Sequence, residues 1–171
     1  HREANELIET ESKLIENRIR ESKKQELANY IALALRAVDH VYKEEPGGTW
    51  KAQKTVKKIL NNLTFSQNGY FFAYDRAGTA LVHPPSPQLI GANLWYLKDE
   101  ENNFVIQQLM KKAVDGGDYH TYLWNNPTTG EPGHMMGYAA YLPNWGWILG
   151  AGLYLDDIEK EVSAFCAVML S

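Results

Sequence analysis

The sequence of 171 residues contains a single cysteine, Cys166, which excludes a disulfide or a thiolate metal cluster within one chain. The five histidines show neither an H-x-x-x-H pattern nor another ligand spacing, so we expect no zinc site. A net charge of -4 creates no basic field, and a nucleic-acid partner therefore has no electrostatic support. Nothing in the sequence indicates a cofactor.

Catalytic motifs are absent as well. No serine or cysteine stands in a nucleophile elbow of the G-x-S-x-G type, and no pair of carboxylates falls near His83. An enzyme, for instance a small hydrolase, is therefore disfavoured. The function classes that remain are a ligand-binding module and an interaction module.

No run of apolar residues reaches the roughly 20 that a membrane-spanning helix requires. The segment FCAVML (165–170) is apolar, however, and follows the charged segment DDIEKEVSA (156–164) without a stop signal. Two interpretations remain open: the end of a helix docked on the core, or the beginning of a transmembrane helix. The chain has no initial Met, which favours an excised fragment.

The first 45 residues are expected to form one long helix, or two joined end to end. They contain no Pro or Gly before the stop signal EEPGG (44–48). About half of the residues from 2 to 26 are charged, and their sparse apolar residues form a narrow seam that suits a partner helix. From Leu27 to Tyr42 the apolar residues recur at three-to-four spacing, which is typical of packing on a sheet.

A shorter helix is predicted from Thr49 to Asn61, and β-strand patterns follow it. Two strands flank the turn at residues 75–78, which has a glycine where a positive φ is needed. Three more strands follow a helix at 103–114, and a last helix begins at Asp156. Five antiparallel strands with helices gathered at one face or end make an α+β domain. The strands are GYFFAYD (69–75), GTALVH (78–83), DYHTYLW (118–124), HMMGYAAYL (134–142) and GWILGAGLY (146–154).

Four longer segments follow one another in a distinctive order. They are GYFFAYDRAGTALVHP (69–84), IGANLW (90–95), GGDYHTYLWNNPTTGEP (116–132) and YLPNWGWILGAGLYLDDIE (141–159). Their order and spacing resemble the single Cache domain of bacterial methyl-accepting chemotaxis proteins and sensor kinases, over about residues 27–160. The resemblance implies a PAS-like antiparallel five-stranded sheet packed on a long N-terminal helix.

The resemblance also implies a domain organisation and a location. Residues 1–45 would be a stalk and dimerisation helix whose second half packs on the sheet. Residues 46–156 would be the Cache ligand-binding domain, and residues 157–171 a C-terminal helix leading to a membrane span. Such a domain is the periplasmic, extracytoplasmic part of a bacterial inner-membrane receptor.

The resemblance implies three partners for a domain of such a membrane receptor. They are a small-molecule ligand, a second copy of the chain bound through the N-terminal helix, and the cytoplasmic signalling region and chemotaxis kinase complex of the full-length receptor. Whether the whole protein is a chemoreceptor or a histidine kinase stays open.

The family's ligand lies over the sheet, beneath the segment that joins the second strand to the next helix. His83 closes that strand, and Pro84, Pro85 and Pro87 stiffen the crossing segment. An aromatic box with one imidazole and several tyrosine hydroxyls suits a C2–C3 carboxylate such as acetate, propionate, pyruvate or lactate. The expected ligand-binding residues are His83, Trp95, Tyr96, Tyr70, Phe72, Tyr74, Tyr122, Trp124, Met136 and Tyr138.

Structural roles for these residues remain alternatives. A lone histidine at a strand end is often satisfied by a carbonyl group, and aromatic residues on one strand face commonly belong to a core. Gly150 and Gly152 lie at alternate positions of the last strand. They either leave room for a ligand or allow a helix to pack closely.

One position departs from the family pattern. The resemblance implies a lysine about three residues before Tyr138, where this chain has Met135 and Met136. Arg76 is a poor substitute because it lies in the hairpin turn. An anionic ligand would then depend on neutral donors and a protonated His83. The alternatives are an uncharged ligand such as urea or an amide, and an interaction module with an empty pocket.

Overall fold

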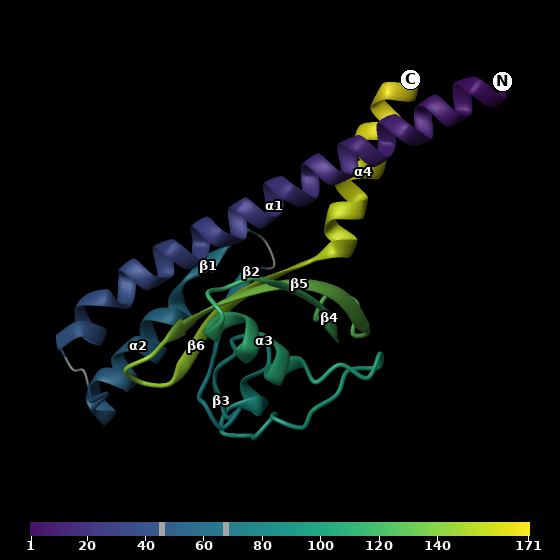
Figure 1. The fold of residues 1–171 in the computed structure, drawn as a ribbon. Helices are drawn as coiled ribbons and strands as arrows, with labels where there is room; N and C mark the ends of the chain where they lie inside the picture. Colours follow the sequence, from purple (N-terminus) through teal and green to yellow (C-terminus); the bar gives the residue numbers. More distant parts are fainter. Residues whose placement is uncertain (45–46, 67–68) are drawn as a thin grey trace.

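The computed structural model describes residues 1–44, 47–66 and 69–171. Its first element is α1 (Arg2–Glu44), one continuous helix of 43 residues (Figure 1). Of the two interpretations of this region, a single helix is therefore the one observed. The predicted stop signal at 44–48 is described only in part, because residues 45–46 lie outside the described residues.

An antiparallel sheet of six strands forms the centre of the domain. Its strands are β1 (Thr64–Phe65), β2 (Gly69–Tyr74), β3 (Ala80–Val82), β4 (Tyr119–Asn125), β5 (Pro132–Leu142) and β6 (Trp147–Tyr154). They lie in the order β1-β2-β6-β5-β4, and β3 pairs with β2. The five predicted strands are thus confirmed, and β1 is an addition of two residues.

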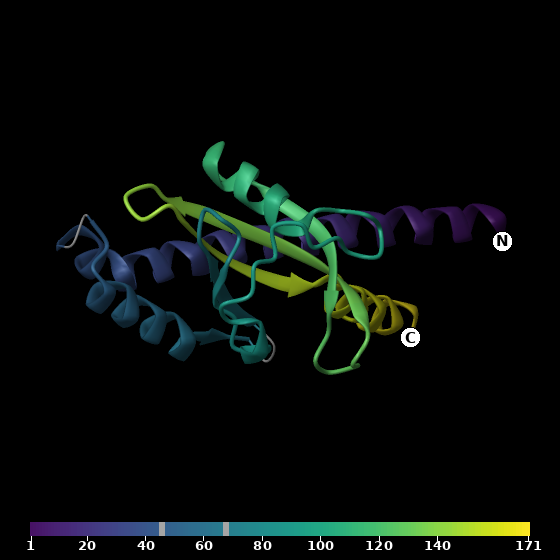
Figure 2. The ribbon, with the colours of Figure 1, turned by 90° about the horizontal axis from the view of Figure 1, so that it is seen from below.

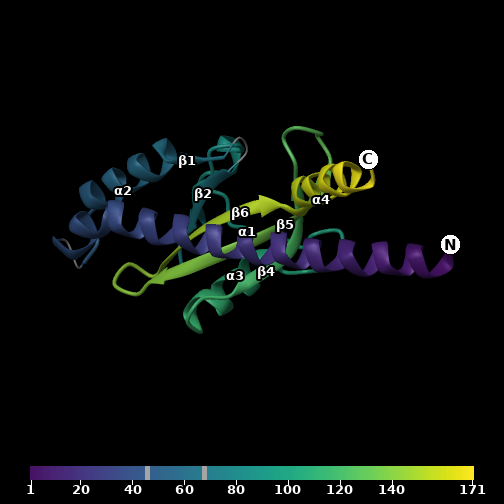
Figure 3. The ribbon, with the colours of Figure 1, turned by 90° about the horizontal axis from the view of Figure 1, so that it is seen from above.

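Helices cover both faces of this sheet (Figures 2 and 3). They are α1, α2 (Trp50–Asn62), the 3-10 helix η1 (Pro87–Leu89), α3 (Val105–Val114) and α4 (Leu155–Leu170). The long helix α1 and α2 lie on one face, whereas α3 and the segment between β3 and α3 lie on the other. The domain therefore has three layers, with the sheet in the middle.

This layering divides the buried apolar side chains into two cores. In β2, Phe71 and Ala73 belong to the core beneath α1, and Tyr70, Phe72 and Tyr74 belong to the core beneath α3. All six residues of β2 are buried as a result. A strand covered on both faces has no solvent-facing side, which explains its unbroken apolar sequence.

The two halves of α1 pack differently, as their sequence patterns predict. In the first half, Leu7 is 60% exposed and Leu14 is 55% exposed. In the second half, Leu27 is completely buried and Ile31 is 2% exposed, because this half lies across the sheet. The helix changes from a solvent-exposed seam to a core element within one continuous segment.

The last helix, α4, begins directly after β6 and lies beside the first half of α1 (Figure 1). The Sγ atom of Cys166 is 3.4 Å from the Oγ atom of Ser12. Further along, Lys23 Nζ is 3.4 Å from a carboxylate oxygen of Glu161. No helix among the described residues is long and apolar enough to cross a membrane.

The packing of α1 leads to a stability prediction. Leu27→Ala is expected to lower the free energy of unfolding by about 2–5 kcal/mol, because it removes a fully buried side chain and leaves a cavity. Leu33→Ala is the matched control, since Leu33 is 61% exposed on the same half of α1 and should change stability by less than about 0.5 kcal/mol. Urea unfolding followed by circular dichroism measures both. Equal effects would mean that the second half of α1 does not pack on the sheet in solution.

Candidate ligand-binding site

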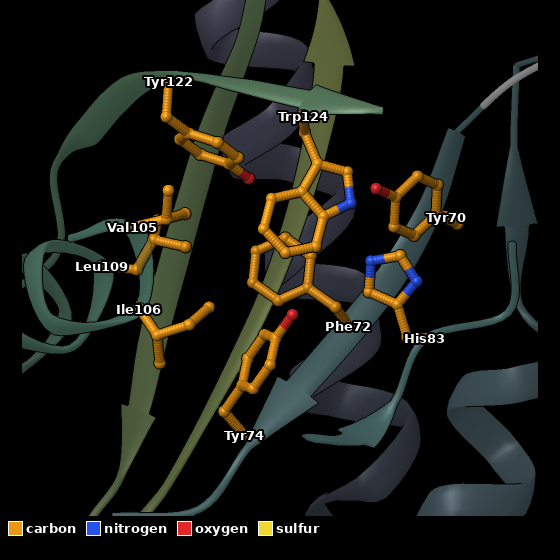
Figure 4. A pocket seen from close by; sticks show the side chains of 9 residues that line it. All are labelled: Tyr70, Phe72, Tyr74, His83, Val105, Ile106, Leu109, Tyr122 and Trp124. Carbon is orange, nitrogen blue, oxygen red and sulfur yellow. The ribbon is translucent and has the colours of Figure 1, made fainter. Parts of the chain in front are cut away.

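A small cavity lies between the sheet and α3, next to the end of β3 (Figure 4). The space open to the centre of a water molecule is about 10 Å³, roughly the room that one water requires. The surrounding side chains therefore nearly fill the cavity. The residues that line it are Tyr70, Phe72, Tyr74, His83, Val105, Ile106, Leu109, Tyr122 and Trp124.

Six of the ten residues expected from the sequence meet at this cavity. Their spacing explains why: β2 contributes alternate residues from one face, and β4 contributes Tyr122 and Trp124 in the same way. His83 follows β3, which pairs with β2, and its ring centroid lies 5.1 Å from that of Tyr70 and 5.6 Å from that of Trp124. Residues from three strands thus surround one point.

The polar atoms of the lining residues belong to three phenol hydroxyls, one indole N–H and one imidazole, each of which can donate a hydrogen bond. Figure 4 shows the hydroxyls of Tyr74 and Tyr122 and the indole nitrogen of Trp124 directed toward the space between the rings. The Tyr122 hydroxyl donates to Met135 Sδ over 3.3 Å, and the Tyr70 hydroxyl reaches the same sulfur over 3.9 Å. A thioether sulfur is a weak acceptor, so a ligand oxygen would be a stronger partner for these hydroxyls.

The tyrosines at the cavity are held in their protonated form. Burial raises the pKa of Tyr70 and the pKa of Tyr122 well above their usual range, and it also raises the pKa of Tyr74. Ionisation would place a charge in an apolar environment, which is costly. These three side chains therefore stay neutral and can donate a proton in a hydrogen bond at any physiological pH.

His83 is the only histidine at the cavity and is 3% exposed. Burial lowers its pKa from 6.5 to about 4, so its imidazole is neutral near pH 7. Its Nδ1 atom is buried and has no hydrogen-bond partner in the part of the chain that the structure describes. A buried polar atom without a partner is unfavourable, and a ligand that pairs with it would remove this cost.

Charged side chains are missing from the wall. None of the described residues that line the cavity is Lys, Arg, Asp or Glu. Arg76 lies in the β2–β3 turn and donates a hydrogen bond to the exposed hydroxyl of Tyr141, away from the cavity. The positive charge that the family resemblance led us to expect near Met136 has no replacement here.

The two glycines of β6 provide the space on which this arrangement depends. A methyl group on Gly150 would overlap the ring of Phe72, and one on Gly152 would overlap the Met135 side chain. Neither glycine admits a helix to the sheet, which was one of the two alternatives. Gly150 instead makes room for Phe72, which lines the cavity. Gly152 makes room for Met135, whose sulfur accepts hydrogen bonds from the hydroxyls of Tyr70 and Tyr122.

The helix α3 forms the opposite wall through Val105, Ile106 and Leu109, which we did not predict as site residues. Their spacing marks the apolar face of an amphipathic helix, and that signal is visible in the sequence. It could have identified a helix face directed at the sheet. It could not show that a cavity remains beneath that face.

Trp95 and Tyr96, which were expected over the ligand, do not line the cavity. The Tyr96 side chain is 79% exposed. Trp95 lies against the outer side of α3 beside Phe104, and its carbonyl oxygen accepts a hydrogen bond from the Gln107 side chain over 2.8 Å. The crossing segment does close over this side of the sheet, but Tyr96 is exposed and Trp95 packs beside α3, outside the cavity.

Met136 and Tyr138 also lie outside the cavity. Both belong to the core beneath α1, on the opposite face of β5, and the Tyr138 ring centroid is 4.9 Å from that of Tyr119. Met135 instead points to the site face, where its sulfur meets the hydroxyls of Tyr70 and Tyr122. The expected position was therefore displaced by one residue, which reverses the face in a strand.

Comparison with known proteins agrees with this fold. The sequence profile of the family described as Single Cache domain 2 matches residues 19–167. The chain belongs to the single Cache domain 2 family. Among curated relatives of this Cache domain, the sensor histidine kinase MctS of Rhizobium johnstonii is 34% identical over 154 residues, which cover 90% of this chain and 33% of the kinase. The methyl-accepting chemotaxis protein McpP of Pseudomonas putida is 29% identical over 112 residues, covering 64% of this chain and 20% of that protein.

Solved structures show the same fold. A methyl-accepting chemotaxis protein from Vibrio parahaemolyticus is 34% identical, with a TM-score of 0.78 over 86% of this Cache domain and 99% of that chain. A second structure, described as the structural basis for carboxylic acid recognition by a Cache chemosensory domain, is 26% identical. Its TM-score is 0.72 over 81% of this chain and 97% of that one. The chain spans a third or less of the curated relatives MctS and McpP, so it matches only one part of each.

The burial of His83 in this Cache domain predicts how stability depends on pH. The unfolded chain binds a proton with a pKa near 6.5 and the folded chain only near 4, so acid favours the unfolded state. Without ligand, the free energy of unfolding should fall by about 2 kcal/mol between pH 8 and pH 5 because of this residue. Urea unfolding at several pH values measures it.

His83→Gln should remove that part of the pH dependence. His134→Gln is the control, because His134 lies on an exposed part of β5, and this variant should keep the loss of stability in acid. An identical pH profile for wild type and His83→Gln would contradict the burial of a neutral imidazole.

Proposed function

We propose that this Cache domain is the extracytoplasmic sensor of a transmembrane receptor and binds a C2–C3 carboxylate such as acetate, propionate, pyruvate or lactate. The observation that carries the proposal is the set of neutral donors around one small cavity. Three tyrosine hydroxyls, an indole N–H and the imidazole of His83 line it. A carboxylate has two oxygens that can each accept several such bonds.

The apolar part of the wall suits the rest of such a ligand. Phe72, Val105, Ile106 and Leu109 offer only carbon atoms to the cavity, as in most small-ligand sites. A methyl or ethyl group would contact these side chains while the carboxylate faces the hydroxyls. The relative described as recognising a carboxylic acid supports this ligand class, since it shares the fold at 26% identity.

Neutral donors replace the missing cation in this proposal. Because His83 is neutral without ligand, a carboxylate would bind first to uncharged groups and would then raise the pKa of the imidazole. An uncharged ligand such as urea or an amide is the second candidate, because hydroxyl oxygens can also accept hydrogen bonds. The carboxylate is the first candidate because the indole N–H of Trp124 can only donate and because the similar structure is described as recognising a carboxylic acid.

Signal transmission has a short structural route. Gly150 and Gly152 of β6 lie directly beneath Phe72 and Met135, and β6 continues into α4 without a loop. The empty cavity holds about one water, so a larger ligand must move its walls. We infer that this movement shifts β6 and α4 relative to α1, and that the ligand selects between two packings.

The domain's relatives define the receptor class only broadly. They include a sensor histidine kinase and methyl-accepting chemotaxis proteins, and none of these names indicates catalysis by the sensor domain itself. We propose a periplasmic location and a cytoplasmic signalling region, which in a chemoreceptor would act on the chemotaxis kinase complex. Both output types remain compatible with the site.

Ligand binding should be visible as stabilisation. Acetate or propionate at about 1,000 times its dissociation constant is expected to raise the free energy of unfolding by about 4 kcal/mol and the melting temperature by several degrees. A thermal-shift screen measures this. No response to acetate, propionate, pyruvate, lactate, urea or small amides would contradict a small-ligand sensor and favour an interaction module with an empty pocket.

Variants of His83 test whether this residue contacts the carboxylate. His83→Ala should weaken carboxylate binding by about 2 kcal/mol, because the carboxylate then lacks one donor in a desolvated site, and His83→Gln should recover part of the loss. His134→Ala is the control outside the cavity. By calorimetry, acetate should bind more weakly as the pH rises through the raised pKa of the bound imidazole, whereas acetamide should not change. Unchanged acetate affinity in His83→Ala would remove this histidine from the site.

A second copy of the chain is the proposed partner of α1. Leu7 and Leu14 lie seven residues apart and are both more than half exposed, whereas α4 covers the face with Ser12 and Ile15. An exposed apolar seam at heptad spacing is typical of helix pairing. The corresponding dimer would be weak in an isolated domain, because a single narrow seam buries little area.

Leu14→Glu tests the dimer. Sedimentation at high protein concentration should show self-association of the wild type and a dissociation constant at least about tenfold larger for the variant, since a charge then enters an apolar seam. Asn5→Glu adds the same charge at another exposed position of α1 and should have little effect. A wild type that stays monomeric at millimolar concentration would contradict pairing through α1 alone.

A further inference from the structure

A second, much larger cleft lies next to the cavity and shares part of its wall. The volume open to the centre of a water molecule is about 400 Å³ in this outer cleft and about 10 Å³ in the cavity. Trp124 and Val105 line both spaces. The remaining residues that line the outer cleft are Ser86, Gln88, Leu89, Leu97, Lys98, Asp99, Glu100, Leu123, Asn125 and Pro132.

Trp124 provides most of the dividing wall, since it is the largest side chain common to both spaces. Its ring meets His83 on the cavity side, with centroids 5.6 Å apart, and Tyr122 along the strand, with centroids 6.1 Å apart. Figure 4 shows the indole with Tyr122 on one side and with Tyr70 and His83 on the other. The indole, together with Val105, therefore forms the wall that the cavity and the outer cleft share.

The strand that carries this ring is fixed at its outer edge. The carboxylate of Asp99 accepts a hydrogen bond from the backbone N–H of Leu123 over 3.0 Å and one from the backbone N–H of Asn103 over 2.8 Å. Partial burial raises the pKa of Asp99, but these hydrogen bonds outweigh that effect and hold the pKa below its usual range. The residue beside Trp124 is thus tied to the loop before α3, which restrains the backbone beneath the indole.

We propose that Trp124 sets the maximum length of the ligand by closing the cavity against the outer cleft. The proposal rests on the carboxylate-binding function proposed above and names the residue that limits the length of the ligands. Because the cavity holds only about one water, even a short ligand must displace its walls, and each further carbon brings the chain closer to the indole. With a smaller residue at position 124, the two spaces join, and a longer aliphatic chain can enter the outer cleft.

The chemistry of the outer cleft suits such a chain. Leu89, Leu97, Leu123 and Pro132 offer apolar contacts along its walls. Each methylene buried there would strengthen binding by about fourfold. The cleft is therefore a space that the wild type excludes from ligand binding, although its surface would favour an alkyl group.

The test is a series of straight-chain acids from acetate to hexanoate, measured by calorimetry on wild type, Trp124→Ala and Trp124→Leu. The wild type should bind pentanoate at least about tenfold more weakly than propionate. Both variants should reduce or invert this ratio, with pentanoate binding at least about fivefold more tightly than it does to the wild type. The ratio is used because loss of the indole N–H also weakens short acids.

Leu123→Ala is the matched control, because Leu123 lines the outer cleft but not the cavity. It enlarges the cleft without removing the wall, so its chain-length profile should equal that of the wild type. A wild type that binds propionate and pentanoate equally overturns the proposal, whether or not the Trp124 variants fold. Folded Trp124 variants with the wild-type profile overturn it as well. Absence of binding for every acid, including acetate and propionate, contradicts the carboxylate function itself and is thereby distinguished from failure of the length limit alone.

Discussion

Burial of the sheet on both faces is the constraint on which the rest of this Cache domain depends. With α1 and α2 on one side and α3 on the other, β2 is buried at every position and β6 at every position except Leu153. Every polar side-chain atom on the site face must then find a partner inside the protein or remain unpaired. The hydroxyls of Tyr70 and Tyr122 find only a weak acceptor in Met135 Sδ, and His83 Nδ1 finds none among the described residues. The fold thus leaves these hydrogen-bonding groups of the candidate site weakly paired or unpaired.

The two glycines of β6 connect the candidate site to the C-terminal helix α4. Because Gly150 and Gly152 lack side chains, Phe72 and Met135 lie directly on the backbone of β6. Displacement of either side chain by a ligand therefore acts on the strand itself. The strand leads directly into α4, which is tied to α1 through Lys23 and Glu161. A close-packed interior transmits such shifts between discrete packings rather than absorbing them.

Much of this site could be predicted from the sequence, and the limits have physical causes. Period-two alternation along β2 placed Tyr70, Phe72 and Tyr74 on one face, and the hairpin turn brought His83 beside them. The segment HMMGYAAYL (134–142) is apolar on both faces, so alternation could not decide between Met135 and Met136. The crossing segment has no period at all, and the position of Trp95 beside α3 depends on tertiary contacts. A cavity is likewise a property of packing, and a helix pattern such as that of α3 cannot reveal it.

The absence of a cation at the cavity is itself consistent with a sensor that must be stable when empty. A buried lysine without its ligand would be an uncompensated charge, which costs several kcal/mol. Neutral hydroxyls and an imidazole with a pKa of about 4 carry no such penalty, so the empty domain stays folded with its site formed. In the sensor function proposed above, a ligand would shift the equilibrium between packings only by its differential affinity for them.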